Sequence, residues 1–158
     1  MTRLPKLALA CDSATHLVLA AAASTGGGAD QPSFDGLLFH AWRRGGGTVR
    51  CAVADPGFDS ERNHRIARRD MGVRSVIPPR AGRPTRKAPS EPMRRHMYHR
   101  FKRGADRAVY GQRWQVETVN SMIKRNLGSA LRGHTAWSRR RDMALKALTH
   151  DLMILAQL

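Results

Sequence analysis

Two short apolar runs with a polar helix pattern between them constrain the fold of this chain most strongly. Residues 48–54 and 73–77 are apolar, partly β-branched and short enough for buried strands. Between them, Ser60 begins a helix pattern with an acidic first turn, and Gly72 stands where a glycine often ends a helix. A strand, a helix and a second strand in this order predict a parallel crossover, and therefore an α/β layer architecture.

The flanking segments extend this pattern. The apolar runs 4–11 and 16–23, separated by a polar turn, predict a β-hairpin, although the alanines of the second run also suit a helix. Helices are predicted over three further segments, 34–42, 107–127 and 137–157. A chain of 158 residues can bury a sizeable core, so we expect a single α/β domain over residues 1–158.

The charge of the chain points to a polyanionic partner. There are 28 Lys and Arg against 12 Asp and Glu, which gives a net charge of +16. The second half of the chain, residues 80–158, carries 18 of these cations and only 5 acids, and most of its cations are arginines. Because Arg binds phosphate in a bidentate manner, nucleic acid is favoured over a membrane surface. An Arg-rich composition typical of a high-GC genome is the alternative, but it does not account for the asymmetry.

Residues 78–106 differ from the rest of the chain. They hold five prolines and nine cations, with Glu91 and Asp106 as the only acids. This composition predicts a basic, poorly packed loop. The loop is either a polyanion contact or a solvated linker.

Cysteine and apolar patterns indicate a cytoplasmic protein. Cys11 and Cys51 lie far apart and belong to no CxxC pair, which favours a reducing compartment and argues against a structural zinc site. The apolar run at 7–10 is shorter than a signal peptide requires, and no run is long enough to span a membrane. We therefore expect no membrane partner.

A polar stripe on the predicted helix 107–127 is the best candidate for chemistry. On a continuous helix, four polar side chains fall within an arc of about 60°, namely Tyr110, Arg113, Glu117 and Lys124. Spacing alone is equally compatible with a ladder of surface salt bridges. Asp55 favours a functional site over the salt-bridge ladder, because it follows a predicted strand. Sites in α/β proteins are usually built at the carboxyl ends of strands.

These residues resemble the DDE transposases of bacterial insertion sequences. Tyr110, Arg113, Glu117 and Lys124 match that family's Tyr-x2-Arg-x3-Glu-x6-Lys signature. Residues 54–60, Ala-Asp-Pro-Gly-Phe-Asp-Ser, are similar to the block around the family's second acidic residue. Segments 76–80 and 148–153 also look like the same group. The likeness therefore covers most of the chain.

The resemblance implies a ribonuclease H-like fold, which is a mixed sheet flanked by helices, with three carboxylates that bind two Mg²⁺ or Mn²⁺ ions. Asp55 would be the second carboxylate ligand and Glu117 the third. Tyr110, Arg113 and Lys124 would hold DNA. The implied activity is metal-dependent cleavage and strand transfer on transposon-end and target DNA, in a nucleoid-associated protein that can form a homo-oligomer.

The family pattern also leaves a gap. Its first catalytic Asp lies on a strand upstream of the predicted hairpin, where this chain begins. Asp12 corresponds to a turn between strands, and Asp30 and Asp35 correspond to solvated or capping positions. Asp59 corresponds to a helix start or, because it is close to Asp55, to a residue that supports a metal ligand. We therefore expect a partial catalytic domain that lacks its first strand and has little activity alone. The alternative is a basic nucleic-acid-binding protein without catalysis.

Overall fold

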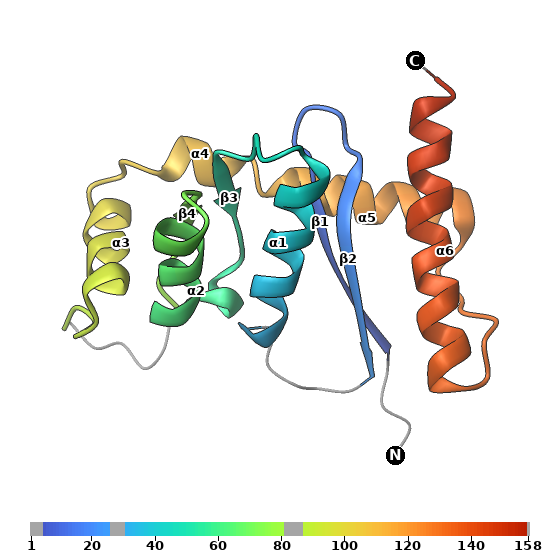
Figure 1. Ribbon diagram of the computed structural model, residues 1–158, viewed down its shortest axis with the longest axis horizontal. Helices are drawn as coiled ribbons and strands as arrows, with labels where there is room; N and C mark the ends of the chain where they lie inside the picture. The colour runs from blue at the N-terminus through green and yellow to red at the C-terminus, as the bar shows by residue number, and fades with distance from the viewer. Residues whose placement is uncertain (1–4, 26–30, 81–86, 158) are drawn as a thin grey trace. The chain divides into compact units, whose positions relative to one another are not determined.

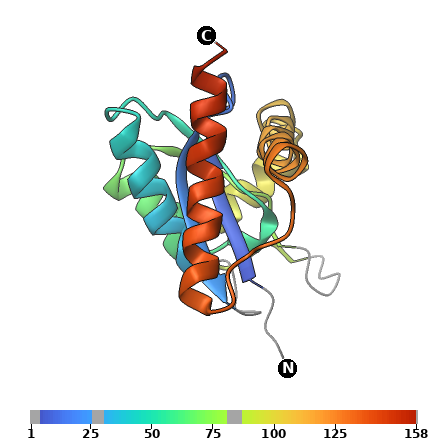
Figure 2. The same ribbon diagram turned by 90° about the vertical axis from the view of Figure 1, so that its right-hand side faces the viewer.

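The computed structural model describes residues 5–25, 31–80 and 87–157 (Figures 1 and 2). Asp30 and positions 81–86 of the predicted basic loop lie outside the described residues. The chain forms two compact units. Unit 1 combines Met1–Gly28 with Trp114–Leu158, and unit 2 is Ala29–Arg113.

Unit 1 contains a β-hairpin and two helices. Strands β1 (Pro5–Cys11) and β2 (Val18–Thr25) pair antiparallel, so the predicted hairpin is confirmed and the helical alternative for the second run is wrong. Helix α6 (Ala136–Leu155) confirms the last predicted helix and lies along the hairpin (Figure 2). Helix α5 (Trp114–Leu127) completes the unit. The buried core joins all three parts through Val18, Val119, Ile123 and Ala147.

The hairpin turn is held by Asp12. Its carboxylate oxygen Oδ1 accepts hydrogen bonds from the amides of Ala14 and Thr15 and from the Thr15 hydroxyl. The Thr15 amide is the main cause of the lowered pKa of Asp12. Asp12 therefore acts as a turn residue, as predicted. His16 follows in the left-handed region, with a φ of 63°.

The block at 148–153 has a clear structural role, because two of its side chains fasten the hairpin turn to α6. The imidazole Nε2 of His150 donates to the carbonyl of His16 (3.1 Å), and Asp151 Oδ1 accepts from the amide of Val18 (2.7 Å). The His16 side chain donates in turn to Gln115 Oε1 on α5 (2.6 Å). These contacts connect the hairpin with both helices of unit 1.

Replacing Asp151 with alanine is expected to lower the free energy of unfolding by about 2 kcal/mol, because the Val18 amide would lose a charged acceptor at a part-buried position. Urea denaturation measures the loss. Asp142→Ala is the matched control, since Asp142 Oδ2 accepts from the exposed amide of Arg132, which water can satisfy. Equal losses in the two variants would contradict this role of Asp151.

Unit 2 contains the predicted parallel crossover. Strand β3 (Cys51–Val53) pairs with β4 (Arg74–Val76) in parallel, and α2 (Glu61–Arg65) connects them through a π-helical turn at Ile66–Asp70. Both strands are shorter than predicted. The Ser60 hydroxyl caps α2 by accepting from the Asn63 amide (3.1 Å), and Gly72 has the positive φ of 66° that the sequence predicts for a helix end.

Helix α1 (Phe34–Arg44), also predicted, covers this crossover (Figure 1). Its side chains Phe34 and Leu38 pack against Ala67, Val73 and Ile77 in the core of unit 2. The described strands thus form two separate two-stranded sheets, one in each unit.

The structure corrects the prediction of a loop over residues 78–106. Helix α3 (Pro92–Lys102) occupies part of this segment and buries Met97 completely. Its first turn is held from outside, because the Glu61 carboxylate accepts from the amides of Met93 and Arg94. The composition of this segment predicts a loop because the groups that stabilise α3 are not in the segment. They come from a distant part of the chain.

The structure also corrects the single helix predicted over residues 107–127. Helix α4 (Arg107–Gly111) ends before α5 begins at Trp114. The amides of Gln112 and Arg113 donate to carbonyls three residues back, at Val109 and Tyr110, which tightens the last turn and ends the helix. Gly111, a poor helix former, lies at this break.

Candidate active site

Asp55 stands at the carboxyl end of β3 in unit 2. Its backbone is extended, with φ −66° and ψ 156°, and Pro56 begins the short turn that follows. The side chain is 51% exposed, and its Oδ1 lies 2.9 Å from Arg113 Nη1. A carboxylate that is accessible and already held by a guanidinium can bind a cation without rearrangement of a core.

Tyr110 belongs to the same cluster. The guanidinium carbon of Arg113 lies 6.0 Å from the centroid of the Tyr110 ring. That ring packs edge-on against Phe101 of α3, with centroids 5.5 Å apart. Asp55 and the pair Tyr110 and Arg113, which the sequence predicts from two separate motifs, therefore meet in one unit.

Glu117 and Lys124 belong to unit 1, on helix α5. The break between α4 and α5 means that the predicted four-residue stripe on a continuous helix is wrong. Glu117 and Lys124 still share one face of α5, because seven residues make almost two full turns. Both side chains are exposed. Their meeting with Asp55 stays a prediction.

Asp59 has a different role from Asp55, although it lies only four positions later in the sequence. It is buried, and its oxygens accept from the Arg94 side chain (2.9 Å) and the Arg80 amide (3.0 Å), while His64 Nε2 lies 3.5 Å away. Burial raises the pKa of Asp59, but the contacts with His64 and Arg94 outweigh it and lower the pKa to about 2. Asp59 anchors α3 and does not start α2, which Ser60 caps.

His64 extends this buried network. Its Nδ1 lies 2.8 Å from Ser75 Oγ, which also accepts from Arg68 Nε (2.9 Å). The order Asp59, His64, Ser75 resembles the triad of a serine hydrolase. Ser75 is 0% exposed, however, and a nucleophile must reach its substrate. The network therefore stabilises the crossover and is not a nucleophilic site.

Asp106 is the charged residue that sequence reasoning missed. It is 0% exposed, and Arg100 binds it in a bidentate manner through Nε (2.6 Å) and Nη2 (2.8 Å), while Arg74 forms a second ion pair. Arg100 is the main cause of the lowered pKa of Asp106, about 2. Its position as one of only two acids in a segment rich in arginine is the signal in the sequence that could have identified it.

The comparisons with known proteins bear directly on this site. Residues 2–152 match the family model of the transposase DDE domain. The chain belongs to this family. The match includes all of unit 2, most of unit 1 and every candidate site residue. Searches of curated proteins and of solved structures found no match.

DDE transposases generally use divalent metals, so the question is which of the described residues could hold such an ion. Within the part of the chain that the structure describes, His, Cys, Asp and Glu form no group of three or more that could hold a metal ion. Mg²⁺ needs fewer protein ligands than this, since it commonly takes one or two carboxylates together with substrate phosphates and water. The exposed carboxylate of Asp55 fits that requirement, whereas the buried and fully bonded Asp59 and Asp106 do not.

Membership of this transposase family implies DNA as the partner. None of the helices in residues 5–25, 31–80 and 87–157 combines the length and the apolar character needed to cross a bilayer.

Proposed function

We propose that this chain cleaves and rejoins DNA phosphodiester bonds in insertion-sequence transposition, with Mg²⁺ or Mn²⁺. The observation that carries the proposal is the exposed carboxylate of Asp55, paired with Arg113 beside Tyr110. This cluster unites the 54–60 block with half of the Tyr-Arg-Glu-Lys signature. The two sheets would then be parts of one ribonuclease H-like domain over residues 1–158, and the family match across both units supports this.

Asp55 and Glu117 would hold the metal. When bound, such ions activate a water or a 3′-hydroxyl and stabilise the leaving oxygen of a phosphoryl transfer. The carboxyl end of a strand gives Asp55 a defined backbone, and the short turn at Pro56 limits its movement. Glu117 lies in the first turn of α5, a rigid helical support.

Arg113 would both orient Asp55 and bind DNA. Its guanidinium has five N–H donors, enough to hold a carboxylate and a phosphate together. Tyr110 supports the guanidinium from one side, and its hydroxyl can donate to a phosphate oxygen. Lys124 would supply a further positive charge from α5.

The alternative, a DNA-binding protein without catalysis, is disfavoured by Asp55 itself. An exposed carboxylate among cations repels the phosphates that such a protein must attract. A metal-binding protein needs that carboxylate.

Thermal melting in Mn²⁺ with a short DNA duplex separates the two functions. At about 100 times the Kd, Mn²⁺ is expected to raise the Tm of the wild type by about 5 °C over the EDTA reference, and Asp55→Asn is expected to abolish this shift. Asp35→Asn is the control, because Asp35 is an exposed acid of unit 2 that pairs with Arg62. A wild type without the shift would support the non-catalytic alternative, and an unchanged shift in Asp55→Asn would refute the role of Asp55.

A further inference from the structure

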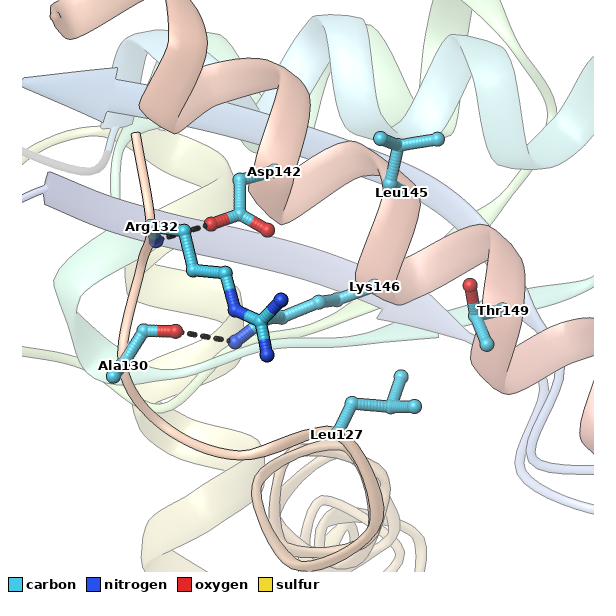
Figure 3. A pocket seen from close by; sticks show the side chains of 7 residues that line it. All are labelled: Leu127, Ala130, Arg132, Asp142, Leu145, Lys146 and Thr149. Atoms are coloured by element: carbon cyan, nitrogen blue, oxygen red, sulfur yellow. Dashed lines mark hydrogen bonds between the residues drawn. The ribbon is translucent and has the colours of Figure 1, made fainter. Parts of the chain in front are cut away.

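An open hollow of about 250 Å³ lies between α6 and the loop that precedes it (Figure 3). Two of the charged side chains that line it bond to that loop. Lys146 Nζ donates to the carbonyls of Gly128 and Ala130, both at 2.7 Å. The Asp142 carboxylate accepts from the Arg132 amide (2.7 Å). These groups hold the loop in unit 1, whereas a buried carboxylate of unit 2 has a less obvious role.

Asp106 stands directly before α4, a position at which an aspartate side chain usually caps the helix. Here the side chain makes no cap. The carboxylate is fully buried and accepts instead from Arg100 of α3 and from Arg74 of β4. A helix of five residues without a cap has little stability of its own. The place of α4 is therefore set by the two elements that Asp106 joins to it.

The turn between α3 and α4 makes these helices one rigid segment. The Ala105 amide donates to the Arg100 carbonyl at 3.0 Å. The Gly104 amide donates to the Phe101 carbonyl at the same distance, and Gly104 has a φ of 75°. These are the two hydrogen bonds of a Schellman motif, which favours glycine at its left-handed position. The Phe101 ring also packs edge-on against Tyr110 of α4, with centroids 5.5 Å apart.

Two backbone hydrogen bonds connect Asp106 to Arg113. The Tyr110 amide donates to the Asp106 carbonyl (2.8 Å), and the Arg113 amide donates to the Tyr110 carbonyl (2.9 Å). The ion pair of Arg113 with Asp55 cannot position the guanidinium by itself, because the Asp55 side chain is 51% exposed and such pairs contribute little. The position of Arg113 therefore depends on α4 and on what holds the start of α4.

The strand pair β3 and β4 supports Asp55 and Asp106 together. Arg74, which binds Asp106, lies on β4. The two strands pair in parallel, and the Ala54 amide extends this pairing by donating to a carbonyl of β4 (3.2 Å). The strands thus stay bonded up to the residue before Asp55. One frame therefore carries the Asp55 carboxylate and, through Asp106, the helix that leads to Arg113.

We propose that Asp106 is a positioning residue of the candidate active site, which holds α4 so that Arg113 meets the Asp55 carboxylate. The proposal rests on the proposed function for the part that Asp55 and Arg113 play in cleavage. It also explains the burial of a carboxylate among arginines. Buried ion pairs often stabilise a fold no better than apolar residues do, but they can fix one arrangement of the elements that they join.

Nitrogen-15 NMR of arginine side chains tests the position of Arg113 in the full chain without any reaction, in EDTA. A guanidinium that is held gives separate Nη–H signals, because its rotation is slow. The signals of Arg113 are those that Arg113→Lys removes. The wild type is expected to show them, and Asp55→Asn is expected to lose them. Asp106→Asn should lose them as well, while circular dichroism shows that the protein is folded.

Two further variants separate positioning from stability. Asp151→Ala is the control, because it removes the acceptor of the Val18 amide in unit 1 and should leave the Arg113 signals unchanged. Arg100→Gln replaces Asp106→Asn should that chain fail to fold, since Arg74 still neutralises the carboxylate. The same loss of signal is expected, because α3 no longer holds the start of α4.

Cleavage of DNA at saturating Mg²⁺ provides a second measurement. Per folded molecule, Asp106→Asn is expected to lower kcat by about 10- to 100-fold, the effect of a displacement of about 1 Å in an active site. In a chain that already carries Arg113→Gln, adding Asp106→Asn should change kcat by less than about 2-fold, because Asp106 acts through Arg113. Asp151→Ala should keep the wild-type kcat.

Several results would overturn the positioning role. These are a wild type without held Arg113 signals, signals that persist in folded Asp106→Asn or Arg100→Gln, their loss in Asp151→Ala, and effects on kcat that multiply in the double variant. A different result would reject the proposed function alone. In that case, Asp106→Asn releases Arg113 as expected, but the wild type cleaves no DNA.

Discussion

Replacing Asp106 with asparagine is expected to lower the free energy of unfolding by about 3 kcal/mol. The carboxylate is fully buried and binds two arginines, one of them in a bidentate manner. Removing one partner of a buried ion pair leaves the remaining charge without compensation, which costs about 3 to 5 kcal/mol. The lower end applies here, since the side chains of Arg74 and Arg100 are 43% and 31% exposed and can turn toward water. Urea denaturation followed by circular dichroism measures the change.

Asp35→Asn is the matched control for Asp106. Asp35 also binds an arginine, Arg62, at 2.7 Å, but both side chains are exposed, at 37% and 55%. Exposed pairs contribute about 0 to 1 kcal/mol, so this variant should lose less than 1 kcal/mol. If both variants lost the same free energy of unfolding, burial of Asp106 could not be the cause of its larger expected loss.

The pH dependence provides a second check on the same residue. The pKa of Asp106 is lowered from 3.8 to about 2 in the folded protein, so its ion pairs stabilise the fold above pH 3.8. That contribution is lost as the pH falls toward about 2, where the folded carboxyl protonates. The stability curves of the wild type and Asp106→Asn should therefore converge between these values. Curves that remained about 3 kcal/mol apart at pH 2 would contradict the electrostatic origin of the effect.

Replacing Asp55 with asparagine is expected to lower the rate of Mg²⁺-dependent DNA cleavage by at least about 10³-fold while the protein stays folded. The rate falls because a metal ligand is lost, and the metal supplies several kcal/mol of transition-state stabilisation, at about 1.4 kcal/mol per tenfold. The fold persists because the side chain is 51% exposed and its pair with Arg113 lies at the surface. Nicking of supercoiled plasmid DNA measures the rate.

Glu117→Gln should reduce cleavage to a similar extent if both acids hold the metal, and Asp35→Asn should cleave at the wild-type rate. Circular dichroism confirms that each variant is folded. Cleavage by Asp55→Asn within tenfold of the wild type would show that Asp55 is not a metal ligand, and Mg²⁺-independent nicking would reject the mechanism as a whole.

Several features of the fold could be predicted because their causes are local. The Ser60 cap and the positive φ of Gly72 depend on a few neighbouring residues. The hairpin depends on two apolar runs around a polar turn that Asp12 closes. Helix α3 could not be predicted in this way. Its segment is rich in proline and arginine, and its stabilising contacts come from Glu61 and Asp59, more than thirty residues earlier in the chain.

The candidate site was also predicted only in part. The motifs identified Asp55, Tyr110, Arg113, Glu117 and Lys124 by type and spacing. The break before Trp114 was missed, because the helical spacing of polar residues does not show where the backbone hydrogen bonds change. At this break, amides donate to carbonyls three residues back and no longer four.

The sequence by itself determined the strand, helix and strand order around Gly72, the family and the identity of the candidate acids. These properties depend on residue type and short spacing, which folding does not alter. Only the tertiary structure decided that Asp59 and Asp106 are buried with arginines while Asp55 stays accessible. The three acids have the same side chain, and each pairs with an arginine. Only the exclusion of water distinguishes a structural charge from one that can bind a metal.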